Sequence, residues 1–342
     1  MKTISITPTE LQKSAVQYLP QLLKMPIIAA QATLKHMTGR PGTRGRVVLG
    51  ELDGDAEVGP YDPSRVDTAD LTAKGRTLET YLGSVIKEFD PNSVWASVYG
   101  ALTTQGEGLK DVNAAREVLS FLAAKLGKNL NKSIWNAVRN PNGTKTRDLF
   151  DGFDTITAAE ISAGKISENK QNLFKFEEEI TRDNAVDFLK QYYWASSDEL
   201  QGQAVKMYIP FSVMHAYEEC YQLTCGIVPY NNKYEKPILE GSNGLCELVP
   251  LSSKKGSQFL TLAPQSNLVY GYGDGLADEK ISIEKYHAFF LQFVATMYFG
   301  VQFKTISPEM LNIGQLYKEE TEGSEEGDGT VNGEWVDPSD QG

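Results

Sequence analysis

The chain is poor in the residues and runs that mark whole classes of protein. It has three cysteines and three histidines among 342 residues, and no apolar run reaches the roughly 18 residues that a membrane-spanning helix needs. Three cysteines without zinc-type spacing favour a reduced compartment over a disulfide framework. The first residues lack the basic-then-apolar pattern of a secretory signal. We therefore expect neither a membrane partner nor secretion.

Motifs that carry chemistry are also missing from the sequence. It has no P-loop, no G-x-S-x-G elbow, no H-E-x-x-H and no C-x-x-C. The run from Gly271 to Gly275 lacks the third glycine of a nucleotide fingerprint, because position 276 is leucine, and this favours a turn. We therefore predict no catalytic, cofactor-binding or metal-binding residue and no enzyme activity.

The histidines are the first group weighed as a possible metal site. His36, His215 and His287 lie far apart in sequence and none has a partner at ligand spacing. His215 can share a helix face with Glu218 and Glu219, but a single H-x-x-E is more often a surface pair than a metal site. We expect a surface pair here.

Three acids faintly resemble a calcium-binding loop. Asp53, Asp55 and Glu57 alternate as the first ligands of such a loop would. The glycine required at the sixth position is Val58, and the twelfth position, where a glutamate is needed, is Ser64. The pattern therefore predicts a polar turn.

Charge is uneven along the chain. The net charge is −12, and residues 319–342 hold nine acids and no lysine or arginine, which leaves −3 for residues 1–318. A Gly- and Ser-rich acidic segment buries too little apolar surface to fold, so we expect residues 317–342 to form a disordered tail. Because an acidic protein gains no affinity from counterion release, we expect no sequence-specific nucleic-acid binding.

One local stretch is basic. In a helix its side chains spread over the polar face, which predicts a solvated or intersubunit ion-pairing face. The alternative is contact with an acidic neighbour, such as the tail of another subunit. The residues of this stretch are Lys125, Lys128, Lys132, Arg139, Lys145 and Arg147.

The first half of the chain contains an arm, a long loop and a long helix. Thr7 and Glu10 form a capping box that opens an N-terminal helix. Six glycines and three prolines between residues 38 and 65 flank a strand at 46–49 and indicate a long hairpin. Apolar spacing over 109–138 predicts a helix of about 30 residues, roughly 45 Å long, which Gly127 bends or splits.

The second half alternates shorter elements and then becomes rich in strands. Asn140 to Gly143 indicates a stop and a turn, and Gly226 is expected to cap the second of two later helices. From Gln258 to Gly314, aromatic and β-branched residues broken by Gly300 favour several short strands. Other expected elements are helices at 184–196 and 212–224, a strand pair or one long strand at 77–93, and strands at 204–209, 246–251 and 258–262.

Five segments, in this order, resemble the major capsid proteins of tailed bacteriophages, which have the Hong Kong 97 fold. The resemblance covers most of residues 36–316, and it implies an α+β fold with an N-terminal arm, an extended loop, a peripheral domain with a long spine helix, and an axial domain. The segments are 37–45 (MTGRPGTRG), 148–153 (DLFDGF), 206–221 (KMYIPFSVMHAYEECY), 238–251 (ILEGSNGLCELVPL) and 257–273 (SQFLTLAPQSNLVYGYG).

The resemblance also implies a division of the chain. It assigns 1–38 to a helical arm, 39–76 to the extended loop, 77–139 to the peripheral domain with the spine helix, 140–275 to the axial domain, 276–316 to the return strands of the peripheral domain, and 317–342 to the acidic tail.

The function implied is that of a structural subunit. It would self-assemble through pentamers and hexamers into the icosahedral shell of a tailed phage or prophage, enclose double-stranded DNA, and belong to the virion after assembly in the bacterial host cytoplasm. Scaffold, portal and decoration proteins are possible partners, and the lack of a long segment before the arm implies a separate scaffold or none. Some family members crosslink this loop through lysine and asparagine; here the loop offers only Lys74, so we expect no crosslink.

Two other functions stay open at this point. One is an encapsulin-like compartment, in which the same fold encloses cargo enzymes. The other is an enzyme or carbohydrate-binding protein whose site is formed by Tyr192, Tyr193 and Trp194, although aromatics at this helical spacing are more often part of a core or an interface.

Overall fold

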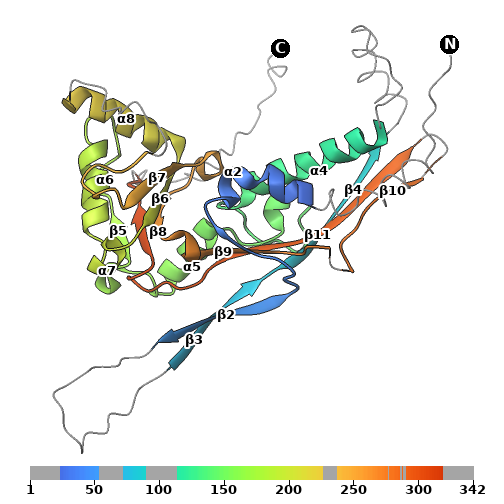
Figure 1. Ribbon diagram of the computed structural model, residues 1–342, viewed down its shortest axis with the longest axis horizontal. Helices are drawn as coiled ribbons and strands as arrows, with labels where there is room; N and C mark the ends of the chain where they lie inside the picture. Colours follow the sequence, from blue (N-terminus) through green and yellow to red (C-terminus); the bar gives the residue numbers. More distant parts are fainter. Residues whose placement is uncertain are drawn as a thin grey trace, which may run out of the picture.

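The computed structural model describes residues 24–53, 72–89, 114–225, 237–275, 277–285, 287 and 290–318. Figure 1 shows three parts: a long sheet with a helix along it, a compact end built of helices around a second sheet, and a hairpin that leaves the body. The predicted mixture of helices and strands is confirmed. The arm before residue 24, the cap at Gly226 and the tail after residue 318 lie outside the described residues.

The long sheet is organised around one strand, β11 (Leu291–Phe303). Its first part pairs antiparallel with β4 (Tyr81–Phe89) and β10 (Ile281–Lys285), and its last part pairs antiparallel with β9 (Leu268–Tyr272). Strand β1 (Thr38–Arg40) adds to β9 in parallel. The aromatic and β-branched residues of the 258–314 segment therefore form the frame of the molecule, as predicted.

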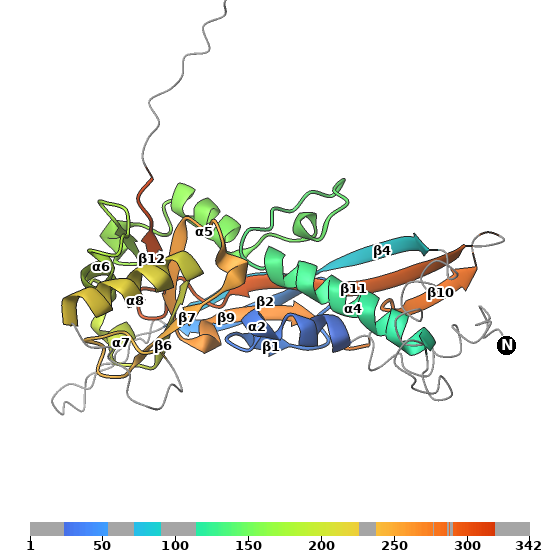
Figure 2. The same cartoon turned by 90° about the horizontal axis from the view of Figure 1, so that it is seen from above.

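One long helix, α4 (Ala114–Ser133), lies along β11 and β4 (Figure 2). It runs without a break across Gly127, so the predicted split is wrong. A side chain at Gly127 would lie 2.2 Å from the Pro26 carbonyl oxygen and 2.6 Å from the Ala29 Cβ. The glycine therefore lets the helical residues 24–29 approach α4 closely; α2 (Gln31–Leu34) follows them.

The predicted helix end at Val138 is also wrong, because α4 stops at Ser133. Beyond it the chain turns so that the carbonyl oxygens of Ile134 and Trp135 accept hydrogen bonds from the amides of Phe153 and Asp154, at 3.2 and 3.0 Å. The first turn of α5 (Phe153–Ser162) thus uses the carbonyls that a longer helix would have used itself. These tertiary contacts end the helix at Ser133, although the apolar spacing of a helix continues in the sequence to Val138.

The compact end is built on a mixed sheet in the order β5, β12, β8, β6, β7. Helices α6 and α8 pack beside it in Figure 1, and α7 follows α6. The expected helices at 184–196 and 212–224 and strands at 204–209 and 246–251 are confirmed. The bounds are β5 (Leu173–Lys175), α6 (Ala185–Trp194), α7 (Asp198–Gln201), β6 (Val205–Ile209), α8 (Phe211–Cys225), β7 (Cys246–Pro250), β8 (Phe259–Ala263) and β12 (Asn312–Gln315).

A two-stranded hairpin projects away from both sheets (Figure 1). Strands β2 (Arg46–Asp53) and β3 (Thr72–Glu79) pair antiparallel over eight residues each. The predicted hairpin is confirmed for these residues, and Thr80 alone separates β3 from β4. Short 3₁₀ helices complete the fold: η1 (Thr146–Asp148), η2 (Glu168–Lys170), η3 (Ser252–Lys254) and η4 (Gln265–Asn267).

Candidate functional site

The candidate metal sites of the sequence do not come together in the part of the chain that the structure describes. No group of three or more His, Cys, Asp or Glu side chains that could hold a metal ion is found among these residues. His36 Nδ1 lies 3.3 Å from Lys206 Nζ, and His215 lies on the exposed face of α8, 6.2 Å from the ring of Phe211. Asp55 and Glu57 lie outside the described residues.

The aromatic run of α6 also forms no common site. Tyr192 is buried and donates a hydrogen bond to the carbonyl oxygen of Asn312 at 2.7 Å. Tyr193 donates to the carbonyl oxygen of Gln201 at 3.1 Å, whereas Trp194 is 55% exposed. The three side chains therefore point to different surroundings: two belong to the core and one to the surface.

The cysteines are small buried residues where they are described. Cys220 and Cys246 are buried free thiols, and burial raises the pKa of Cys246 to about 12. A thiol with so high a pKa is almost wholly protonated at neutral pH, so it is a poor nucleophile.

A buried ion pair is the feature that most resembles a catalytic site. Lys254 is fully buried, and its Nζ lies 3.3 Å from Asp154 Oδ1 and 4.0 Å from the centroid of the Trp135 ring. The same ammonium donates hydrogen bonds to the Phe259 carbonyl oxygen at 2.6 Å and to Ser257 Oγ at 3.3 Å. These contacts join α5, the turn after α4 and η3 in one cluster.

Burial controls the electrostatics of this pair. It raises the pKa of Asp154 and lowers the pKa of Lys254, while the attraction between the two groups opposes both shifts. Both groups are closed off from solvent, since Lys254 is 0% and Asp154 8% exposed. The pair is therefore placed to fix the packing between segments rather than to meet a substrate.

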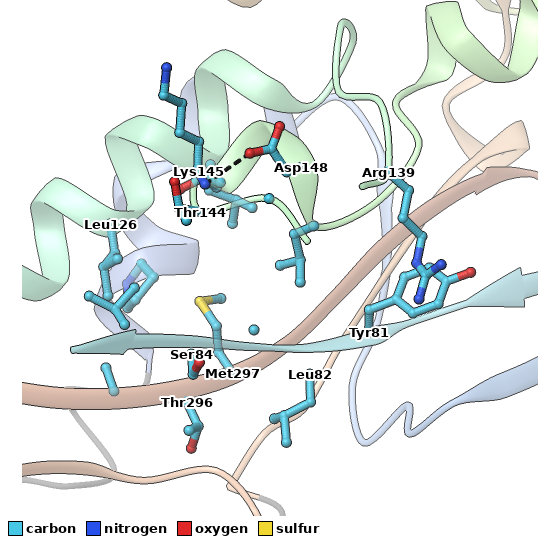
Figure 3. A pocket seen from close by; sticks show the side chains of 18 of the residues that line it. Tyr81, Leu82, Ser84, Leu126, Arg139, Thr144, Lys145, Asp148, Thr296 and Met297 are labelled. Carbon is cyan, nitrogen blue, oxygen red and sulfur yellow. Dashed lines mark hydrogen bonds between the residues drawn. The ribbon is translucent and has the colours of Figure 1, made fainter. Parts of the chain in front are cut away.

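One groove, of about 400 Å³, opens between α4, β4 and β11 (Figure 3). Leu126 and Met297 point into it from opposite sides. At its rim the guanidinium of Arg139 stacks over the Tyr81 ring at 3.9 Å, and the Lys145 amide donates to Asp148 Oδ2 at 3.0 Å. The groove is lined by apolar and polar side chains, and burial together with the hydrogen bond to Glu79 raises the pKa of Tyr81 at its rim.

A polar contact fixes the base of the hairpin to the body. Arg76 of β3 donates from Nη2 to Glu160 Oε1 of α5 at 2.7 Å and to Gln302 Oε1 of β11 at 3.1 Å. Glu160 also faces Lys165 at 3.3 Å. Burial raises the pKa of Glu160, but the hydrogen bonds and charges of Arg76 and Lys165 together outweigh this effect, so the pKa is lowered overall.

Apolar and backbone contacts support the same junction. Leu49 and Leu78 of the hairpin form a small buried cluster with Val269 of β9. Thr80 donates through its hydroxyl to the carbonyl oxygens of Thr43 and Gly45, at 3.2 Å each. The hairpin is thus held to the body at its base.

Exposed apolar side chains are spread over the extremities of the molecule. They occur on the hairpin, on the open face of β4, on the outer face of α4 and on α6 and α8. Scattered single residues are ordinary, but these sit on projecting elements, where a neighbour can cover them. They include Val48, Leu82, Ile86, Phe121, Trp194, Phe211 and Leu223.

The comparisons with known proteins rest on structure alone. No family model and no curated protein sequence matches the chain. The capsid of a native GTA particle is similar with a TM-score of 0.56 at 11% identity, over 84% of this chain and 91% of that one. The procapsid of satellite phage P4 is similar with a TM-score of 0.55 at 11% identity, over 93% and 94%.

The chain has the Hong Kong 97 capsid fold. A third similar structure is the SrpI encapsulin complex of Synechococcus elongatus PCC 7942, with a TM-score of 0.50 at 12% identity, over 82% of this chain and 85% of that one. The capsid fold therefore extends over more than four fifths of the chain in each comparison, as the resemblance of the sequence segments had implied.

The contacts that fix this fold could not be found from the sequence. Arg76 and Glu160 are 84 positions apart, and Lys254 and Asp154 are 100 positions apart. Each residue looks like an ordinary surface charge in its own segment. Only the topology, which brings α5 beside β3 and η3, shows that they are partners.

Proposed function

We propose that the chain is the structural subunit of an icosahedral capsid shell of a tailed phage or prophage, and that it self-assembles to enclose double-stranded DNA. The observation that carries this proposal is the hairpin. It is fixed at its base by Arg76 and Glu160, yet within the described residues its two strands pair only with each other. A compact monomer gains little from such an element, whereas a closed lattice needs segments that reach a neighbour.

The division of the chain follows from the same proposal. Residues 39–76 act as the extended loop, α4 as the spine helix, 140–275 as the axial domain that meets its copies at the vertices, and 276–316 as the return strands. The scattered apolar residues suit this arrangement, because a subunit of a shell is covered by several neighbours on different sides. The subunit needs no catalytic residue, and its location is the virion.

The proposal is tested by deleting residues 51–74 in the full chain, which removes the outer part of the hairpin and keeps β1, Leu49 and Arg76 at its base. We expect the wild-type chain, expressed alone or with its neighbouring phage genes, to form closed particles in negative-stain microscopy. The deleted chain should remain a folded, soluble subunit by circular dichroism and form no shells. Particles of normal size from the deletion would remove the role assigned to the hairpin.

An encapsulin-like compartment is the second candidate, because the SrpI encapsulin shares the fold. The P4 procapsid subunit matches a larger share of both chains with a higher TM-score, which favours the phage shell. The contents of purified particles distinguish the two: a phage shell takes up DNA in the presence of its packaging proteins, and a compartment encloses a cargo protein.

A further inference from the structure

Basic and acidic residues are concentrated in different segments of this chain, which the net charge alone does not show. Between Val118 and Arg147 there are six lysines and arginines and no acid, in a chain whose net charge is −12. Residues 319–342 have the opposite composition, with nine acids and no base. The two segments are therefore complementary in charge within one polypeptide.

The structure gathers three of these bases on one face of α4. Lys125, Lys128 and Lys132 follow each other at helical spacing and are all exposed, and Phe121, 69% exposed, continues the row by one turn. At 100° per residue these four positions fall within about 60° of the helix surface. We call the three lysines the cationic face of α4.

The cationic face has no acidic partner in the described part of the chain. The ion pairs that the described residues form are made by other lysines and arginines, such as Lys165, Lys254 and Arg76. Three neighbouring ammonium groups repel each other, so an anionic partner would lower their electrostatic free energy. A conformationally adaptable acidic segment can place several carboxylates along such a row.

We propose that the C-terminal segment 319–342 lies on the cationic face of α4 in the same chain. The last described residue is Lys318, shortly after β12, and 24 further residues can span up to roughly 80 Å when extended. Helix α4 is about 30 Å long, so the extended segment is long enough to cover the whole cationic face. Attachment to one chain gives the segment an effective concentration in the millimolar range, which favours this source over a second copy.

The 319–342 segment also has apolar residues that could pack on Phe121, next to the lysines of the cationic face. Trp335 and Val336 stand among its acids, and Phe121 offers an exposed ring beside the lysines. The contact would shield the cationic face from other polyanions, including nucleic acid, as long as the segment occupies it. It is independent of the shell function, because it is a property of the isolated subunit.

Zero-length crosslinking with a carbodiimide tests the contact directly. The full-length chain, as a mixture of ¹⁵N-labelled and unlabelled protein, is treated at about 0.1 M salt, where the screening length is about 10 Å, and at about 1 M, where it is about 3 Å. We expect crosslinked peptides that join Lys125, Lys128 or Lys132 to acids of 319–342. Both peptides of each crosslink should be labelled or both unlabelled, because they come from one chain, and these crosslinks should disappear at high salt. Crosslinks only to other lysines, or only between different isotopes, would overturn the proposal.

Proteolysis of charge variants gives a second, independent readout. A glutamate-specific protease should cleave the 319–342 segment about tenfold faster in the Lys125→Gln, Lys128→Gln, Lys132→Gln triple variant, the effect expected of three exposed ion pairs. The corresponding Lys→Arg triple variant, which keeps the charge, should resemble the wild type. A matched control replaces the exposed residues Lys170, Arg182 and Lys255 by glutamine. Equal cleavage rates in the two glutamine triples would contradict the proposal.

Discussion

The hairpin and the compact end are held in place by contacts of different kinds. Strands β2 and β3 are fixed to the body by the partly exposed ion pair of Arg76 with Glu160, by hydrogen bonds of Arg76 and Thr80, and by a three-residue apolar cluster. The compact end is joined to the rest through one continuous buried cluster and through the buried pair of Lys254 and Asp154. The difference shows that the body is stabilised by buried contacts. The hairpin is held to the body by the contacts at its base.

The largest expected effect comes from breaking the buried pair. The Lys254→Met substitution leaves the Asp154 carboxylate buried without a partner, and this should lower the free energy of unfolding by about 3–5 kcal/mol. Chemical denaturation monitored by circular dichroism measures it. The double variant Lys254→Met, Asp154→Leu should recover most of the loss, because no uncompensated charge remains.

The matched control for this substitution is the next residue. Lys255 is exposed, and its change to methionine should alter stability by about 0.5 kcal/mol or less. If the Lys254 and Lys255 variants were equally stable, the buried pair would not hold the body together as we describe.

The second effect concerns the close approach at Gly127. Alanine in place of glycine usually stabilises a helix by about 1 kcal/mol. Here the added Cβ would lie within 2.2 Å of the Pro26 carbonyl oxygen, so Gly127→Ala should instead destabilise the protein by about 1–3 kcal/mol. Asn129→Ala, on the exposed side of the same helix, should give a small gain, and a gain at both positions would refute the packing of residues 24–29 on α4.

A smaller effect on stability is expected at the hairpin junction. Arg76→Ala should lower the free energy of unfolding by only about 1 kcal/mol, since the pair is partly exposed. Hydrogen exchange of the β2 and β3 amides should nevertheless rise, and particle yield should fall, because the hairpin loses its fixed direction. Arg46→Ala breaks the exposed pair with Glu79 within the hairpin and should leave particle yield unchanged.

The smallest effect is the pH dependence of the same junction. The pKa of Glu160 is lowered in the folded chain, so its stabilisation is present above the unfolded value of about 4.3 and is lost as the pH falls through the lower folded pKa. Glu160→Gln should therefore destabilise the protein at neutral pH and flatten the loss of stability in acid. Parallel acid-denaturation curves for wild type and variant would show that the junction does not titrate.

The sequence predicts the elements of this fold better than their limits. Strands rich in aromatic residues between 258 and 314, the hairpin around Val47 and the helices at 184–196 and 212–224 are local patterns, and the structure confirms them. The end of α4 at Ser133 depends on hydrogen bonds from Phe153 and Asp154, which no local pattern encodes. Partners such as Arg76 and Glu160 depend on the topology in the same way.

The most direct test of the central claim is the size of the particle that the full chain forms. Light scattering and negative-stain microscopy of the purified chain, expressed with and without the products of its neighbouring genes, measure it. Our account predicts closed shells for the wild type and dispersed, folded subunits for the chain without residues 51–74. A wild-type chain that stays monomeric at high concentration under both conditions would contradict it.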